Sequence, residues 1–366
     1  MLRSRLPSRL RTQQFFSSRH QLKSVARIIP FSTNGEQQSS STRQKIVPIT
    51  VTVALGLAAA TYFFFPDPYR GAPTTKNAPL SPSHFTPVKV ISNEHSGPDT
   101  KLLKIAVPSQ LLPAPEDRTA FFTPIWSVFI KDDDIQVERP YTPLEGVNEN
   151  GHMLFWIKKY PKGEVGRWLH SKVPGDEIEL RGPLMTWPWM EDKYDEVVMI
   201  SGGTGITPFY QLFHTLIANP STTSKTRFTL LHSSRIPEEL PPSAILDPLV
   251  QYSSSNPDKF RLHVFVDSQD GSTPPSPIPE IHTGRISETD IRRCIGLGKL
   301  RLSWWQKLYQ KEEPVDLTQR RILFIVCGPE PMINAISGPY GRNYSQGPVG
   351  GMLAAIGFSS SQVRKL

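Results

Sequence analysis

The stretch from Val197 to Pro208, VVMISGGTGITP, decides the fold because it joins three kinds of local structure in a fixed order. The apolar run Val197–Ser201 favours a buried strand, glycines follow it, and a helix is expected to begin near Pro208, since proline fits a first helical turn. Glycines let the backbone approach a phosphate or a ring closely, and a helix N-terminus attracts negative charge. This order predicts a nucleotide-binding α/β unit.

Residues 191–366 share the character of that stretch. Their strand candidates are nearly continuous apolar runs, with helical stretches between or after them. The strands are Val197–Ser201, Phe228–His232, Arg261–Val266 and Ile322–Cys327, and the helices are Pro208–Ile217, Glu288–Ile295 and Pro331–Ser337. Such strands belong to a parallel sheet covered by helices on both faces. We therefore expect a Rossmann-like, parallel-sheet α/β domain over residues 191–366.

Residues 85–190 have a different texture, with short strand candidates between turn signals and no convincing helix before residue 164. The candidates are Pro87–Ser92, Lys101–Pro108, Ile125–Lys131, Met153–Tyr160 and Glu177–Arg181. They are rich in β-branched and aromatic residues, as strands are. The pattern predicts a small antiparallel β-barrel, so the fold class is a β-barrel followed by an α/β domain.

The N-terminal part of the chain is predicted to be a targeting peptide followed by a membrane anchor. Residues 1–45 hold nine Lys or Arg and one acid, which is typical of a mitochondrial transit peptide, although a disordered basic tail has a similar composition. The uncharged run 46–65 is long enough for a transmembrane helix, with a buried core helix as the alternative. Residues 66–84 read as a linker. The positive charge before the anchor favours the matrix side, which predicts an inner-membrane protein whose domain after Pro66 lies in the intermembrane space.

Charge and cysteine content exclude several functions. The net charge of +8 comes from the N-terminal part, because the rest of the chain carries 32 basic and 32 acidic side chains. A nucleic-acid groove is therefore not expected. Two cysteines, Cys294 and Cys327, are too few for a disulfide framework or a zinc site, and no His/Cys cluster has the spacing of metal ligands.

Three further motifs carry groups that bind cofactors. The first, RPYTPL at 139–144, offers an Arg for a pyrophosphate and a Tyr for a flat ring, although it could equally be a surface strand end. The second, GEVGRWL at 163–169, places backbone amides at a helix start. The third, CGPEPM at 327–332, falls at the C-terminal end of a strong strand, where ligands of α/β sheets bind.

Taken in order, these motifs resemble the ferredoxin–NADP reductase superfamily, in its cytochrome b5 reductase branch, over residues 85–366. The segments GDEIELRGP at 175–183 and GGTGITP at 202–208 belong to the same series. The resemblance implies a Greek-key FAD-binding barrel and a nicotinamide-binding domain. It also implies hydride transfer from NAD(P)H to FAD and single-electron delivery to an acceptor.

The resemblance also implies roles for individual residues. The FAD site would comprise Arg139, Tyr141, Thr142, Ile157, Lys159, Gly163, Glu164, Val165 and Gly166. The nicotinamide nucleotide would meet Gly203, Thr204, Gly205, Thr207, Cys327, Gly328, Pro329 and Met332. Thr142 and Cys327 are assigned as the catalytic residues, beside the flavin and the nicotinamide respectively. Cys327 is interpreted as lining the site, because no His partner or resolving cysteine indicates a nucleophile.

Two positions depart from the family pattern. Gly166 stands where the family usually has Ser or Thr, which removes one side-chain hydrogen bond to phosphate. The family usually ends in an aromatic residue after a basic one, whereas the sequence here ends in Val363-Arg364-Lys365-Leu366. Both departures are expected to affect FAD retention or access to the flavin.

The C-terminal stretch, with QGPVGG at 346–351, is similar to fungal mitochondrial inner-membrane flavoproteins that assist haem attachment to c-type cytochromes. That similarity implies haem, a c-type cytochrome and cytochrome haem lyase as partners. Three functions stay open: a reductase for cytochrome c maturation, a mitochondrial NADH-cytochrome b5 reductase, and a non-catalytic assembly factor that keeps FAD.

The choice between NADH and NADPH also stays open. Ser233, Ser234 and Arg235 follow a strand and could bind a 2′-phosphate, but Arg235 could equally be an exposed turn residue. Segments 269–283 and 304–314 match no pattern that we can interpret.

Overall fold

The computed structural model describes residues 72–114, 117–133, 136–190, 193–220, 224–297, 317 and 320–366, all within a unit that spans residues 68–366. The predicted leader, the apolar segment 46–65 and the segment 304–314 lie outside the described residues. No helix among the described residues is long and apolar enough to cross a membrane.

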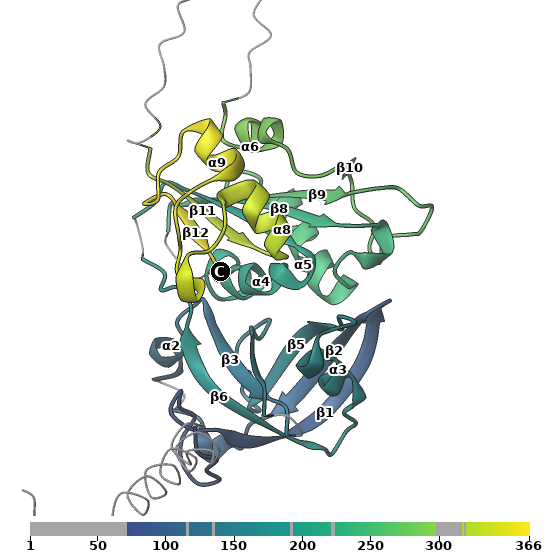
Figure 1. The fold of residues 1–366 in the computed structure, drawn as a ribbon, viewed down its shortest axis with the longest axis vertical. Helices are drawn as coiled ribbons and strands as arrows, with labels where there is room; N and C mark the ends of the chain where they lie inside the picture. Colours follow the sequence, from purple (N-terminus) through teal and green to yellow (C-terminus); the bar gives the residue numbers. More distant parts are fainter. Residues whose placement is uncertain are drawn as a thin grey trace, which may run out of the picture. The chain divides into compact units, whose positions relative to one another are not determined.

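Strands β1 to β6 form one curved sheet in the order β4-β3-β6-β1-β2-β5 (Figure 1). The strands are β1 Thr86–Gly97, β2 Thr100–Ala106, β3 Trp126–Lys131, β4 Glu138–Tyr141, β5 His152–Lys158 and β6 Glu177–Met185, with helices η1 Ser109–Leu111, α2 Arg118–Phe121 and α3 Glu164–Ser171. Every neighbouring pair of strands is antiparallel, which confirms the antiparallel prediction. Buried and more exposed residues alternate along much of β6, as expected for a half-buried strand.

Strand β4 was missing from the sequence prediction because Pro140 lies within it. Proline cannot donate to a neighbouring strand, so it is confined to edge strands and strand ends, and β4 is an edge strand. Just after β4, the backbone N–H of Leu144 donates to the carbonyl oxygen of Leu154 on β5 at 2.8 Å. The two edges of the sheet thus meet through this loop contact, while no β4–β5 ladder exists among the described residues.

Six parallel strands form the second sheet, in the order β10-β9-β8-β7-β11-β12. They are β7 Glu196–Gly202, β8 Arg227–Ser234, β9 Phe260–Val266, β10 Ile281–Thr283, β11 Ile322–Cys327 and β12 Val363–Lys365. All seven residues of β7 are buried, which confirms the prediction of strands covered on both faces. The short edge strands β10 and β12 were not predicted, since three residues carry little pattern.

Helices cover both faces of this sheet (Figure 1). They are η3 Gly203–Ile206, α4 Thr207–Leu212, the π-helix η4 Phe213–Ile217, η5 Pro237–Glu239, α5 Ser243–Ser255, α6 Glu288–Cys294, α8 Glu330–Ser337, η7 Arg342–Tyr344 and α9 Gly351–Ile356. Val197 and Met199 of β7 pack in one cluster with α4 and α5, whereas Val198 and Ile200 pack in another with α6, α8 and α9. Because successive side chains of a strand point to opposite faces of the sheet, β7 contributes to two separate apolar cores.

Helix α5 is the longest described helix, and the sequence analysis missed it. Pro242 precedes its first residue and Pro248 lies inside it, and proline inside a helix removes one backbone hydrogen bond. The helix nevertheless buries Ile245, Leu246 and Leu249 against the sheet. Tertiary packing thus overrides an unfavourable local signal.

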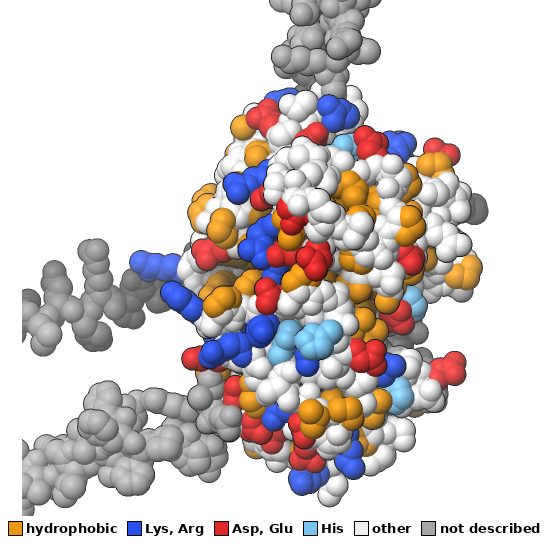
Figure 2. All heavy atoms as spheres, turned by 90° about the vertical axis from the view of Figure 1, so that its right-hand side faces the viewer, with side chains coloured by type: hydrophobic (Ala, Val, Ile, Leu, Met, Phe, Trp, Pro, Cys, Tyr) orange, Lys and Arg blue, Asp and Glu red, His pale blue; other side chains and the backbone are white. Residues whose placement is uncertain are grey.

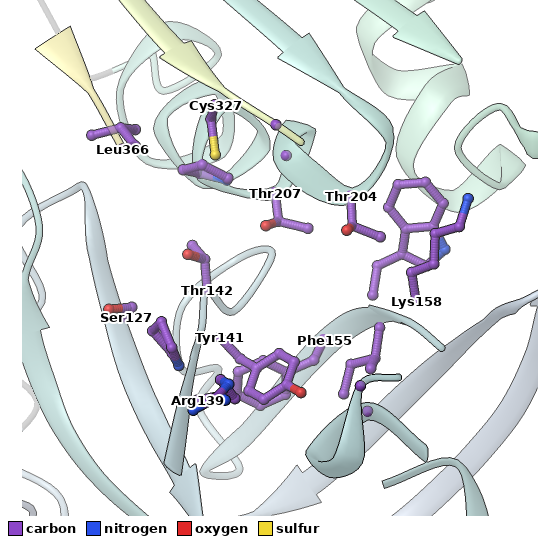
Figure 3. Close-up of a pocket in the computed structure, with 18 of the residues that line it drawn as sticks. Ser127, Arg139, Tyr141, Thr142, Phe155, Lys158, Thr204, Thr207, Cys327 and Leu366 are labelled. Atoms are coloured by element: carbon purple, nitrogen blue, oxygen red, sulfur yellow. The ribbon is translucent and has the colours of Figure 1, made fainter. Parts of the chain in front are cut away.

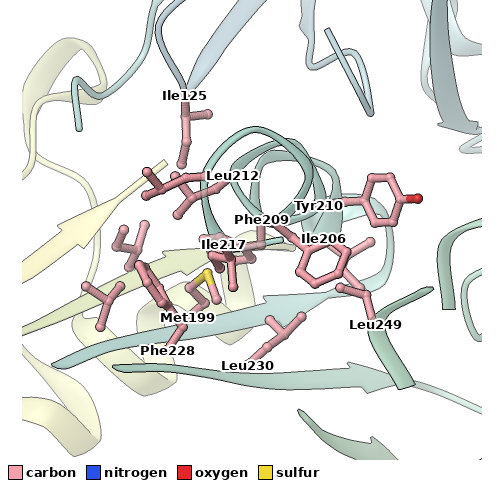
Figure 4. Close-up of a cluster of buried hydrophobic side chains, with 14 of the residues drawn as sticks. Ile125, Met199, Ile206, Phe209, Tyr210, Leu212, Ile217, Phe228, Leu230 and Leu249 are labelled. Atoms are coloured by element: carbon pink, nitrogen blue, oxygen red, sulfur yellow. The ribbon is translucent and has the colours of Figure 1, made fainter. Parts of the chain in front are cut away.

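The two sheets meet around Gln211 of α4, which is fully buried. Its side-chain oxygen accepts from the backbone N–H of Trp126 (2.9 Å), and its nitrogen donates to the carbonyl oxygens of Trp126 (3.1 Å) and Pro143 (3.0 Å). Around it, Ile125 of the antiparallel half joins Phe209 and other residues of the parallel half in one apolar cluster (Figure 4). A satisfied buried amide of this kind fixes the position of α4 against β3.

Candidate active site

A cleft of about 490 Å³ lies where the two halves meet, and both of them line it. The antiparallel half contributes β4, β5 and the start of α3, and the parallel half contributes the turn after β7 and the end of β11. Figure 3 shows Arg139, Tyr141 and Thr142 on one side of this cleft, and Thr204, Thr207 and Cys327 on the other. The cleft therefore brings residues from separate sequence motifs into one site.

Strand β4 places a charged and an aromatic side chain on the cleft. The carboxylate of Glu138 pairs with Arg181 (2.7 Å from Oε2 to Nη2), so it does not neutralise Arg139, which has no carboxylate partner among the described residues. A free guanidinium beside a cleft can bind a pyrophosphate with two parallel hydrogen bonds. Burial raises the pKa of the Tyr141 phenol, against the opposite effect of the Arg139 charge, so this ring stays neutral and is available for stacking.

The first turn of α3 forms the adjoining part of the cleft. Gly163 occupies the N-cap and has no side chain to cap the helix, so the first amides, those of Glu164, Val165 and Gly166, need other partners. A helix start with free N–H groups favours an anion such as phosphate. A Cβ atom on Gly166 would lie 3.1 Å from the carbonyl oxygen of Lys158, which is tight but not prohibitive.

The glycines on the opposite wall serve the packing of the protein itself. A Cβ atom on Gly205 would lie 2.7 Å from the carbonyl carbon of Cys327, and one on Gly202 would lie 2.6 Å from Sδ of Met332. By contrast, Gly203 has a φ of +54°, and a Cβ atom there would meet nothing within 4 Å. The sequence interpretation gave these glycines one purpose, close approach to a ligand. For Gly205 the structure adds another, close contact with the end of β11, and for Gly202 it adds close contact with the start of α8.

Cys327 ends β11 and lines the cleft. Burial raises the pKa of its thiol to about 12, so the sulfur is a neutral thiol at physiological pH. A thiol in that state is a poor nucleophile, which agrees with the interpretation that Cys327 lines the site. Thr207, at the start of α4, is buried and also lines the cleft, so neutral side chains form this wall.

Most of the predicted site residues line this cleft. They are Arg139, Tyr141, Thr142, Ile157, Gly163, Glu164, Val165, Gly166, Thr204, Gly205, Thr207, Cys327, Gly328 and Pro329. Three predicted residues are not among the lining residues. Lys159 donates its backbone N–H to Asp99 instead, Gly203 lies in the turn, and Met332 packs beneath Gly202.

Sequence analysis did not assign a role to several other lining residues. They are Ser127, Phe155, Trp156, Lys158, Tyr160, Lys162, Thr186 and Leu366. The sequence signal that could have found them is the apolar run Phe155, Trp156 and Ile157 in β5. The structure buries all three, which breaks the alternation of a half-buried strand. Nε1 of Trp156 is also buried and has no hydrogen-bond partner within the part of the chain that the structure describes. The orphan donor, the free Arg139 and the open helix start fit a ligand with polar ring edges and a pyrophosphate, as FAD has.

Comparisons with known proteins agree with this geometry. Residues 87–189 match the oxidoreductase FAD-binding domain family, and residues 199–338 match the oxidoreductase NAD-binding domain family. NADH-cytochrome b5 reductase 2 of Scheffersomyces stipitis is 30% identical over 280 residues, covering 76% of this chain and 82% of that protein. The protein of the same name from Saccharomyces cerevisiae is 27% identical over 328 residues, covering 89% and 98%.

Among solved structures, the cytochrome b5 reductase domain of Ulva prolifera nitrate reductase has the same fold. The TM-score is 0.55 at 21% identity, covering 78% of this chain and 99% of that domain. The chain belongs to the cytochrome b5 reductase-like branch of the ferredoxin–NADP reductase family. It is an NAD(P)H-dependent FAD oxidoreductase.

Proposed function

We propose that this member of the cytochrome b5 reductase-like family takes electrons from NADH and delivers them to haem iron, in the service of c-type cytochrome maturation. The observation that supports electron transfer is the shared cleft. Thr142 of the antiparallel half lines it together with Thr207 and Cys327 of the parallel half. Bound FAD would supply the conversion of a two-electron donor into one-electron delivery. The protein would supply the binding, the orientation and the neutral walls.

The preference for NADH is supported by an ion-pair group at the end of β8. Nε of Arg235 donates to the Glu239 carboxylate at 2.9 Å, and Nζ of Lys158 lies 3.2 Å from the same carboxylate. Burial alone would raise the pKa of Glu239, but the hydrogen bonds from Arg235 and Lys158 hold it below its ordinary value. Arg235 is thus neutralised and less able to bind a 2′-phosphate, whereas a carboxylate there suits a ribose hydroxyl.

The acceptor is proposed from the C-terminal sequence. The stretch at 346–351 that resembles haem-attachment flavoproteins belongs to the segment packed on β12, beside the cleft. A small acidic haem protein as acceptor is the second candidate, and it is favoured by the name of the relatives, NADH-cytochrome b5 reductase 2. Basic and acidic side chains are interspersed on the face in Figure 2, which gives little support to a strongly basic docking face.

The location belongs to the same proposal. The basic, acid-poor leader 1–45 and the uncharged run 46–65 support a mitochondrial inner-membrane protein with a single anchor. Charge asymmetry supports a catalytic part in the intermembrane space, where c-type cytochromes and cytochrome haem lyase would be its partners.

The experiment is an anaerobic titration of the flavin spectrum of the full-length protein. NADH is expected to bleach the flavin at lower concentration than NADPH, and ferric haem added afterwards is expected to be reduced. Preferential reduction of a b5-type cytochrome over haem would support the second candidate. A flavin that neither nucleotide bleaches would leave only the non-catalytic assembly factor. Glu239→Gln is expected to bring the concentrations of NADH and NADPH that bleach the flavin closer together.

A further inference from the structure

An imidazole ring is buried in the core of the parallel half, beneath the glycine turn. His232 of β8 is completely buried, and each of its ring nitrogens lies beside the hydroxyl of a buried serine. Nδ1 is 2.8 Å from Oγ of Ser201 on β7, and Nε2 is 3.4 Å from Oγ of Ser234 on β8. The function proposed above assigns no role to this ring.

The direction of the hydrogen bonds around His232 follows from its partners. Oγ of Ser234 lies 3.2 Å from the carbonyl oxygen of Glu239, which can only accept, so the single hydrogen of the Ser234 hydroxyl goes to that carbonyl. Nε2 of His232 must therefore donate to Ser234. Burial lowers the pKa of His232 to about 3, so the ring is neutral at physiological pH and has only this one N–H. Nδ1 then accepts from the Ser201 hydroxyl.

This chain of hydrogen bonds runs along the edge of the sheet where a nucleotide is expected. At one end, Ser201 directly precedes the glycine turn and is paired with His232 across β7 and β8. At the other end is Glu239, whose carboxylate is bound by Arg235 and Lys158. Ligands of parallel sheets bind at the carboxyl ends of the strands, and both ends of the chain lie there. The buried ring therefore connects two regions that face the nucleotide.

Glu239 is held in place from two sides. It ends η5, a 3-10 helix of three residues, and the Ser234 hydroxyl ties its backbone to β8. On the other side, its carboxylate lies 3.2 Å from Nζ of Lys158 on β5. A group that recognises a ligand must be held within about 0.5 Å of its productive position, which fixed neighbours provide. Loss of the bond from Ser234 would therefore change where the carboxylate lies without removing it.

We propose that His232 is a positioning residue for the nicotinamide dinucleotide. Through Ser234 it holds Glu239 where the carboxylate accepts a hydrogen bond from a ribose hydroxyl, and it thereby sets the preference for NADH over NADPH. The His232 ring is completely buried and does not line the cleft, so it acts through Glu239. This inference rests on the NADH preference and on the role of Glu239 proposed above.

The test is anaerobic stopped-flow bleaching of the flavin in the full-length, FAD-loaded protein, with NADH and NADPH in turn. Two variants of His232 form a matched pair, because a glutamine amide replaces Nε2 and an asparagine amide replaces Nδ1. His232→Gln keeps the donor to Ser234, so the half-saturating concentration of NADH should stay within about twofold of the unaltered protein. His232→Asn loses that donor and should raise this concentration about fivefold, with the limiting rate and the value for NADPH nearly unchanged.

Two further variants separate positioning from a general loss of packing. Ser234→Ala removes the hydroxyl that binds the Glu239 carbonyl, and it should also raise the half-saturating concentration of NADH about fivefold. It still decides the question if His232→Asn does not fold, because it leaves the ring in place. Thr229→Val is the control, since Thr229 is a buried residue nearer the start of the same strand, and it should leave the values for both nucleotides unchanged.

Three outcomes would overturn the proposal: equal half-saturating concentrations of NADH in the glutamine and asparagine variants, an unchanged ratio of NADH to NADPH in Ser234→Ala, or a hydrogen on Nδ1 of His232 in the ¹⁵N NMR spectrum. The unaltered protein separates this inference from the function proposed above. If NADH is preferred there and the variants keep that preference, only the role of His232 fails. If neither nucleotide bleaches the flavin of the unaltered protein, the reductase function itself fails.

Discussion

The two walls of the cofactor cleft are built in opposite ways. On the α/β wall, Gly205 packs tightly against the end of β11, Gly202 packs against Met332 of α8, and Cys327 is a neutral, desolvated thiol. On the wall of the antiparallel half, the guanidinium of Arg139 has no carboxylate partner among the described residues, and the first amides of α3 have no side-chain cap. The difference indicates that changes on the α/β wall should mainly alter stability, and changes on the wall of the antiparallel half should mainly alter cofactor affinity.

The largest effect is expected for Gly205→Ala. Its Cβ atom would overlap the carbonyl group of Cys327 and come within 2.8 Å of Cα of Gly328, and both neighbours are backbone. The free energy of unfolding should fall by about 3 kcal/mol, measured by urea denaturation. Gly203→Ala is the control, because that position has space but a left-handed backbone, and should cost about 1 kcal/mol. Equal losses in the two variants would contradict the packing argument.

The α/β half should also lose stability in acid through His232. This ring is fully buried between Ser201 Oγ (2.8 Å from Nδ1) and Ser234 Oγ (3.4 Å from Nε2), and burial lowers its pKa to about 3. In the unfolded chain the His232 ring binds a proton near pH 6.5, whereas the buried ring stays neutral down to about pH 3. The neutral ring therefore contributes fully to the free energy of unfolding above pH 6.5, and this contribution is lost as the pH falls toward 3.

Between about pH 7 and pH 5, the free energy of unfolding should therefore fall by about 2 kcal/mol on account of this group. Denaturation of His232→Gln at the two pH values is the measurement, because glutamine does not titrate. If the variant keeps the full pH dependence of the unaltered protein, other groups cause it.

Local sequence predicted the parts of the fold whose pattern is strong. The buried run at β7 and the glycine turn after it were predicted closely, since a strand covered on both faces is apolar throughout. Helix α5 was missed because Pro248 is a breaker in isolation, and only the packing of Ile245 and Leu249 stabilises it. Strand β12 was missed because it has only three residues, and because the basic residue Lys365 is held there by Gln346 of a distant loop.

The candidate site shows the same division. Motifs supplied the residues that a cofactor would touch through charge or backbone, such as Arg139 and the start of α3. Trp156, Lys158 and Leu366 were not assigned, because their place in the cleft depends on how two separate sheets meet. The Lys158 ammonium is held in the cleft by its ion pair with Glu239 of the other half, which lies far away in the sequence.

On the wall of the antiparallel half, Arg139→Met is expected to lower the affinity for FAD without lowering the free energy of unfolding. The Arg139 side chain is exposed and makes a hydrogen bond only to the adjacent carbonyl of Glu138 among the described residues, so its removal should leave the unfolding of the FAD-free protein almost unchanged. Loss of a charged hydrogen-bond donor to pyrophosphate should weaken FAD binding about tenfold or more, measured by fluorescence titration. A large loss of stability without a change in FAD affinity would reverse the assignment of the two walls.

The smallest effect is expected for Gly166→Ser, which restores the residue type that the family usually has. The hydroxyl would stand at the open start of α3, and one further hydrogen bond to phosphate should tighten FAD binding by a few-fold, about 0.5–1 kcal/mol. The new Cβ atom lies 3.1 Å from the Lys158 carbonyl, so part of this gain is offset by a slight displacement. Gly166→Ala, with the same Cβ atom and no hydroxyl, measures that displacement alone. Tighter binding in the serine variant than in the alanine variant would show that this wall still lacks a phosphate ligand, whereas equal binding would mean that the backbone amides already satisfy the phosphate.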